Sequence, residues 1–114
     1  MLKPAKERRR SQRLTVQTPA VLTGTDSESR AFFERTEIIS FDQRGARLRT
    51  RFLLTCGTEV EVQLATEKES KRLRVVWRGD PNTLFAGLVG LELVDPNDCW
   101  SPATLRAQWE ARDF

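Results

Sequence analysis

Short stretches in which apolar and polar residues alternate run through this sequence from residue 14 to residue 94. Residues 58–64 show the pattern most clearly, because their valines and leucine fall on one face of an expected strand and their polar residues on the other. Clusters such as residues 79–82, which contain glycine, proline and asparagine, mark turns between the stretches. Strands are expected over residues 14–22, 31–39, 46–51, 58–64, 72–77 and 86–94. Six short strands joined by turns predict an all-β fold, a six-stranded antiparallel barrel.

The apolar side of these strands defines the expected core, which should include Val60, Val62, Leu64, Val75, Leu91 and Leu93. In residues 46–51 arginines alternate with smaller or apolar residues, so the arginines are expected to face solvent. Trp77 continues the alternation of its own strand, which favours a core position for its ring. Residues 40–45 are mostly polar and end in Gly45, so a loop is expected there.

After the last strand the sequence takes on the features of a short helix. Ser101 is a favourable N-cap residue, and Pro102 suits the first helical position. A short amphipathic helix is therefore expected over residues 102–112. Trp100 precedes the cap and is expected to pack on Leu105, as in a hydrophobic staple.

The positive charge of the chain is concentrated at its N-terminus. The net charge is +3, but residues 1–13 hold six Lys or Arg and one Glu, a net +5, so the rest of the chain sums to −2. This polar segment is expected to be a flexible basic arm. A basic arm attached to a nearly neutral body favours an anionic ligand. The expected organisation is an arm over residues 1–13, a barrel over residues 14–95, and a C-terminal segment, residues 96–114, whose helix packs on the barrel.

The composition argues against an enzyme. The chain has no histidine, which removes histidine-based acid–base catalysis and the Ser-His-Asp and Cys-His triads. Cys56 and Cys99 do not form a CxxC pair, and we expect two buried or unreactive thiols, no metal site and no cofactor. No apolar run approaches the ~18 residues of a membrane span. No secretory signal follows the N-terminal charges, so a cytoplasmic protein is expected.

Two motifs stand out in the N-terminal half of the chain. In residues 9–13, Arg9 and Arg13 have the spacing RxxxR just before the first expected strand. Residues 40–48 read SFDQRGARL and lead into the third expected strand. In this order the two motifs resemble the PilZ domain family, whose signature is RxxxR followed by D/N-x-S-x-x-G. Later strands of the chain also look like the family's last two, so the resemblance covers about residues 8–95.

The resemblance implies a PilZ-like barrel that binds cyclic di-GMP. It implies that Arg9 and Arg13 clamp the guanines and phosphates, and that residues 40–45 form the opposite wall. The chemistry agrees, since guanine O6 and N7 accept a bidentate guanidinium pair and arginine stacks on flat purines. Gly45 permits a positive φ or a close backbone approach, and Trp77 resembles the family's aromatic residue near the site. The candidate ligand-binding residues are Arg9, Arg10, Arg13, Ser40, Asp42, Arg44, Gly45 and Arg47.

The second motif departs from the family pattern at two positions. Aligned on Gly45, Ser40 stands where the family has Asp or Asn, and Asp42 stands where the family has Ser. A carboxylate there is unfavourable for a ligand with two phosphodiester charges. Two functions therefore remain open: a receptor that orders its arm on cyclic di-GMP and signals to a partner protein, or a degenerate PilZ-like adaptor that binds proteins and no nucleotide. A nucleic-acid-binding barrel that uses Arg8 to Arg13 with Arg47, Arg49 and Arg51 is opposed by the nearly neutral body and by the expected lack of exposed Tyr or Phe stacking platforms.

Overall fold

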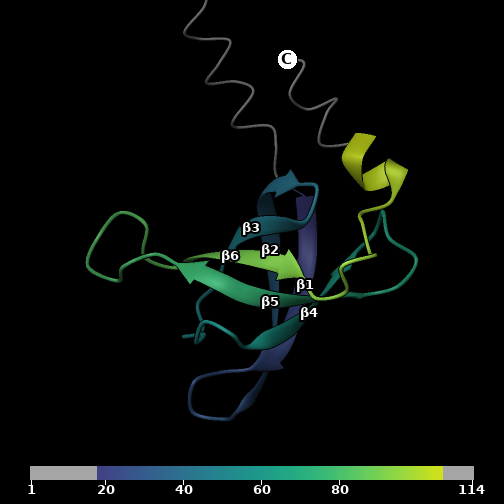
Figure 1. The fold of residues 1–114 in the computed structure, drawn as a ribbon. Helices are drawn as coiled ribbons and strands as arrows, with labels where there is room; N and C mark the ends of the chain where they lie inside the picture. The colour runs from purple at the N-terminus through teal and green to yellow at the C-terminus, as the bar shows by residue number, and fades with distance from the viewer. Residues whose placement is uncertain (1–17, 107–114) are drawn as a thin grey trace, which may run out of the picture.

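Six strands form a closed antiparallel barrel (Figure 1). The computed structural model describes residues 18–106, so the predicted arm over residues 1–13 lies outside the described part. The strands are β1 (Thr18–Thr25), β2 (Ala31–Asp42), β3 (Gly45–Arg49), β4 (Glu59–Leu64), β5 (Lys71–Arg78) and β6 (Leu88–Leu93). Their order is β1-β2-β3-β6-β5-β4, and pairing of β4 with β1 closes the barrel. The predicted all-β barrel of six antiparallel strands is confirmed.

Alternating side chains fill the interior of the barrel. In β4, Val60, Val62 and Leu64 are buried while the residues between them are exposed, which is the strand period of two. All six residues predicted for the core are at most 3% exposed. The buried cluster extends to further strands and to the segment after β6, and its largest additional members are Leu22, Ile38, Leu48, Leu54, Leu73 and Trp100.

The loop predicted over residues 40–45 is wrong, because most of these residues belong to strands. β2 continues to Asp42 and β3 begins at Gly45, so only Gln43 and Arg44 form the turn between them. The Asp42 Oδ1 atom accepts a hydrogen bond from the Arg44 backbone N–H at 2.9 Å. An aspartate before and a glycine after two central residues of negative φ are typical of a type I turn. The polar sequence is therefore explained by a tight hairpin.

Two β-bulges interrupt the alternation. One lies in β2 between Ile38 and Ser40, opposite β3, and the other lies in β5 between Val75 and Trp77, opposite β6. A bulge inserts one extra residue, so the side chains after it change face relative to a regular strand. Val76 and Trp77 are consequently both on the outside, 51% and 40% exposed. The core position predicted for Trp77 is therefore wrong.

The C-terminal segment begins a helix where it was predicted. Residues 102–106 are helical, and the Ser101 Oγ atom accepts the Thr104 backbone N–H at 3.2 Å, which confirms Ser101 as the N-cap. The expected packing of Trp100 on Leu105 is wrong. Trp100 is 1% exposed, packs edge-on against Phe41 and belongs to the barrel core, whereas Leu105 is 40% exposed. The rest of the predicted helix lies outside the described residues.

Candidate functional site

A hollow of about 190 Å³ lies on the outer face of the barrel, where β2, β3, β6 and β5 run side by side. Both bulges border it, and they turn side chains outward that a regular strand would direct elsewhere. We refer to it as the Trp77 hollow; its lining residues are Ser40, Asp42, Ala46, Arg47, Val76, Trp77, Gly90 and Leu91. It brings together three candidate ligand-binding residues from the second motif, namely Ser40, Asp42 and Arg47.

Strand pairing places the central residues of the hollow in one row. Ser40 of β2 is paired with Arg47 of β3, Arg47 with Gly90 of β6, and Gly90 with Trp77 of β5. The Arg47 guanidinium carbon lies 5.4 Å from the centre of the Trp77 ring, within the range of a cation–π contact. Gly90 has no side chain to separate these two groups. The row therefore presents an exposed aromatic ring and an exposed guanidinium together on the surface.

Ser40 and Asp42 supply the polar edge of the Trp77 hollow. Ser40 is half-buried and Asp42 is exposed, and both lie on β2 after its bulge. One carboxylate oxygen of Asp42 accepts the Arg44 backbone N–H, so this side chain also holds the hairpin turn. Asp42 thus places a negative charge at the rim of a hollow that contains the cation of Arg47.

Arg44 does not line the Trp77 hollow, because its guanidinium binds the segment that follows β6. It donates hydrogen bonds to the backbone oxygens of Leu93 and Asp98 at 3.0 Å and of Asp95 at 3.4 Å. The Asp98 side chain pairs with Lys71 at 2.7 Å; this hydrogen bond raises the pKa of Lys71 and lowers the pKa of Asp98. Arg44 therefore fastens the hairpin of the second motif to the C-terminal segment.

Gly45 is required where β3 meets β6. An ideal Cβ atom on Gly45 would lie 1.9 Å from the Leu91 backbone oxygen, closer than any real contact. Of the two reasons considered for this glycine, the close backbone approach is correct and the positive φ is wrong. The Gly45 carbonyl also accepts a 3.0 Å hydrogen bond from the Trp100 indole N–H. Gly45 thus shapes the hairpin and presents no side chain to a ligand.

The remaining candidates, Arg9, Arg10 and Arg13, lie outside the described residues, so their role stays a prediction. Four lining residues were not predicted from the sequence, namely Ala46, Val76, Gly90 and Leu91. Val76 follows the alternation to the surface, whereas Trp77 reaches the surface through a bulge that the alternation does not reveal. Gly90 offered a signal, since a glycine inside a strand often marks close approach by another group.

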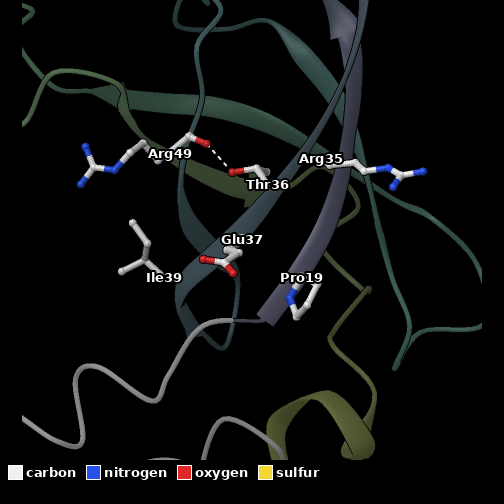
Figure 2. A pocket seen from close by; sticks show the side chains of 6 residues that line it. All are labelled: Pro19, Arg35, Thr36, Glu37, Ile39 and Arg49. Carbon is white, nitrogen blue, oxygen red and sulfur yellow. Dashed lines mark hydrogen bonds between the residues drawn. The ribbon is translucent and has the colours of Figure 1, made fainter.

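A larger hollow of about 600 Å³ lies on the outer face of β1, β2 and β3. Figure 2 shows that its two cations, Arg35 and Arg49, point to opposite sides, with Glu37 between them. The Thr36 hydroxyl donates to the Arg49 backbone oxygen at 2.6 Å. Charges that diverge around a carboxylate do not form a focused anion site, so the smaller Trp77 hollow is the better candidate.

Three further features of residues 18–106 bear on function: metal ligands, cysteines and membrane-spanning helices. No group of three or more cysteine, aspartate or glutamate side chains there could hold a metal ion. Cys56 and Cys99 are both free and exposed, so the first part of the expectation, that they are buried, is wrong, and their low reactivity stays a prediction. Within the same range, no helix has the length and apolar character needed to cross a bilayer.

Comparison with known proteins identifies the family. The family model of the PilZ domain matches residues 7–99, which include both motifs and all six strands. Neither a comparison with curated proteins nor one with solved structures found a match. PilZ domains are in general receptor modules for cyclic di-GMP that bind a ligand and do not catalyse a reaction. Because the family model matches most of this chain and the strands form the closed barrel, the chain belongs to the PilZ domain family.

Proposed function

We propose that this protein is a cyclic di-GMP receptor module that binds its ligand over the Trp77 hollow. The observation that carries the proposal is the row in which Arg47 and Trp77 lie together on the outer face of the barrel. An exposed indole offers a stacking surface to a guanine. A guanidinium beside it can bind a phosphate or the O6 and N7 edge of guanine. The family membership supplies the ligand class.

The arginine arm completes the proposed site. Thr18, the first residue of β1, is paired with Ile38, which adjoins the β2 bulge beside Ser40. Arg13 precedes Thr18 by five residues, a span of at most roughly 18 Å when extended. We propose that this length lets Arg13 reach a ligand in the Trp77 hollow. Arg9 and Arg10 would then engage the far side of the ligand.

Binding would order the arm and form a new surface for a partner protein. This function requires no metal, no cofactor and no catalytic residue, and it suits a cytoplasmic protein. The organisation that we propose keeps the arm over residues 1–13, the barrel over residues 14–95 and the C-terminal segment over residues 96–114.

A second function, an adaptor that binds proteins and no nucleotide, is favoured by Asp42. This carboxylate occupies the family's serine position, and it lies exposed at the rim of the hollow. Like charges ~4 Å apart repel by about 4 kcal/mol at an effective dielectric constant of ~20. Solvent and the neighbouring Arg47 reduce this repulsion to ~1–2 kcal/mol, which is comparable with one arginine contact. The strength of this one interaction separates the receptor from the adaptor.

Replacing Trp77 tests the receptor proposal directly. Trp77→Ala should weaken cyclic di-GMP binding by about 1–2 kcal/mol, roughly five- to thirtyfold, because a base loses its stacking surface. Calorimetric titration of both proteins measures the change. Phe33→Ala is the matched control, since Phe33 is an exposed aromatic residue of β2 that does not line the hollow. Equal affinities for the Trp77→Ala protein and the control would place the ligand elsewhere.

Removing the Asp42 charge should have the opposite effect. Asp42→Ser should tighten cyclic di-GMP binding by about 1–2 kcal/mol, and adding Ser40→Asp should tighten it further by restoring the family pattern. A serine can still accept the Arg44 N–H, so the turn is preserved. Asp80→Ser is the matched control, because Asp80 accepts the backbone N–H two residues ahead in the same way but lies outside the hollow. An affinity that falls in Asp42→Ser would identify Asp42 as a ligand of the guanine N1–H and N2 amine.

A further inference from the structure

The loop between β5 and β6, residues 79–87, projects from one side of the barrel (Figure 1). It carries two adjacent apolar side chains, those of Leu84 and Phe85, which are 92% and 57% exposed, and we refer to this exposed pair as the crest. Leu53 is also exposed, and it lines a small hollow together with Pro81 at the base of the loop. Adjacent large apolar side chains on a projecting surface indicate an interaction site.

The loop is held in shape by its own hydrogen bonds. The Thr83 backbone N–H and hydroxyl both donate to the Asp80 backbone oxygen, at 3.0 and 2.8 Å. The Phe85 N–H donates to the Thr83 hydroxyl oxygen at 3.1 Å, and the Leu88 N–H donates to the Phe85 oxygen at 3.0 Å. Gly79 lets the chain turn back, since a Cβ atom there would lie 1.9 Å from the Phe85 oxygen. The exposure of the crest is therefore built into the fold, and binding through it needs little further ordering.

The base of the loop is cationic. Arg78 ends β5 and donates to the Leu54 backbone oxygen at 3.3 Å, while Arg49 ends β3 and donates to the Ala86 backbone oxygen at 3.2 Å. Neither arginine forms an ion pair with another residue of the described range. The acidic residue of the loop, Asp80, uses one carboxylate oxygen to accept the Asn82 N–H. Two cations thus lie beside the apolar crest and are available to an anionic partner.

We propose that this loop inserts into the surface of an anionic phospholipid bilayer. Leu84 and Phe85 would enter the boundary between head groups and acyl chains, and Arg49 and Arg78 would lie at the level of the lipid phosphates. An exposed apolar pair flanked by cations suits a bilayer, whose apolar interior lies beneath a layer of lipid phosphates. A fluid bilayer also accepts a projecting side chain without a pocket of matching shape. The association is peripheral, and it does not rest on cyclic di-GMP binding.

Sedimentation of the full chain with lipid vesicles tests this proposal. Vesicles of phosphatidylcholine with an equal part of phosphatidylserine should bind the protein, and vesicles of phosphatidylcholine alone should bind it much less. Replacing both crest residues, Leu84→Ser with Phe85→Ser, should lower the partition coefficient about tenfold or more. Leu105→Ser is the matched control, because Leu105 is exposed on the C-terminal helix, away from the loop (Figure 1). Its partition coefficient should equal that of the unmodified protein.

The cationic base is tested separately. Arg78→Gln should lower binding to the phosphatidylserine vesicles and weaken its dependence on salt, whereas Lys68→Gln, an exposed charge in the turn between β4 and β5, should change neither. The basic arm alone could attract anionic vesicles, and the loop variants separate the two contributions. Equal binding of the crest variant and the unmodified protein would assign binding to the arm and overturn the proposal. Failure of the unmodified protein to bind phosphatidylserine vesicles would overturn it as well. Urea unfolding of each variant verifies that its barrel is intact.

Discussion

A Gly45→Ala protein should lose about 3 kcal/mol of unfolding free energy, the upper end of the range for an overpacked site. The added methyl group would meet the Leu91 backbone oxygen at 1.9 Å, and a backbone atom cannot move aside as a flexible side chain can. Relief requires β3 and β6 to separate. That separation weakens the ladder between them and disturbs the Trp100 hydrogen bond to the Gly45 oxygen.

Urea unfolding followed by circular dichroism measures this loss. Gly90→Ala is the matched control, because Gly90 lies in the partner strand β6 and an ideal Cβ there is 3.5 Å from the Trp77 Cβ, an ordinary contact. Its unfolding free energy should change by less than about 1 kcal/mol, because the added methyl group meets no close atom and alanine has less freedom in the unfolded chain. Equal stabilities for the two variants would show that β3 and β6 do not approach as closely as the structure has them.

Arg13→Ala should weaken cyclic di-GMP binding by roughly 1.5–3 kcal/mol, about tenfold to 150-fold. In the proposed site Arg13 donates charge-assisted hydrogen bonds to a guanine or a phosphate. These bonds are stronger than neutral ones, because the donor carries a full charge. Calorimetric titration at two salt concentrations should also show weaker binding at the higher one, since ions screen the attraction.

Lys6→Ala is the control for Arg13→Ala, because it removes the same charge from the arm outside the RxxxR spacing. It should lose much less affinity, through the general electrostatic attraction alone. Equal losses of affinity in the two proteins would mean that the arm acts only through its overall positive charge. Unchanged affinity in Arg13→Ala would reject the arginine clamp.

The barrel and its core could be predicted from the sequence because side chains in a strand alternate with a period of two. In β4 the valines and the leucine mark the buried face without help from any other part of the chain. In β5 the same rule placed Trp77 inside, and it failed there because the bulge at Val76 adds one residue to the strand. A bulge depends on how a strand pairs with its neighbour, and the alternation of one strand does not contain that information.

Part of the candidate site was predictable from the family motif. Ser40, Asp42 and Arg47 were identified through the family motif, and the structure brings them to one hollow. Arg44 was grouped with them because it is adjacent in sequence, yet its guanidinium binds backbone oxygens more than 45 residues further along the chain. Contacts between segments so far apart are decided by the closed barrel, which the local sequence does not specify.

Calorimetric titration of the unmodified 114-residue chain with cyclic di-GMP tests the central claim most directly. GTP and cyclic GMP serve as controls, because each has a single guanine and lacks the ring that joins two guanosines through two phosphodiesters. The account predicts saturable heat with cyclic di-GMP, weaker binding at higher salt, and no saturable heat with either control. A folded protein, verified by circular dichroism, that gives no saturable heat with cyclic di-GMP would contradict the receptor and leave the adaptor as the function of this domain.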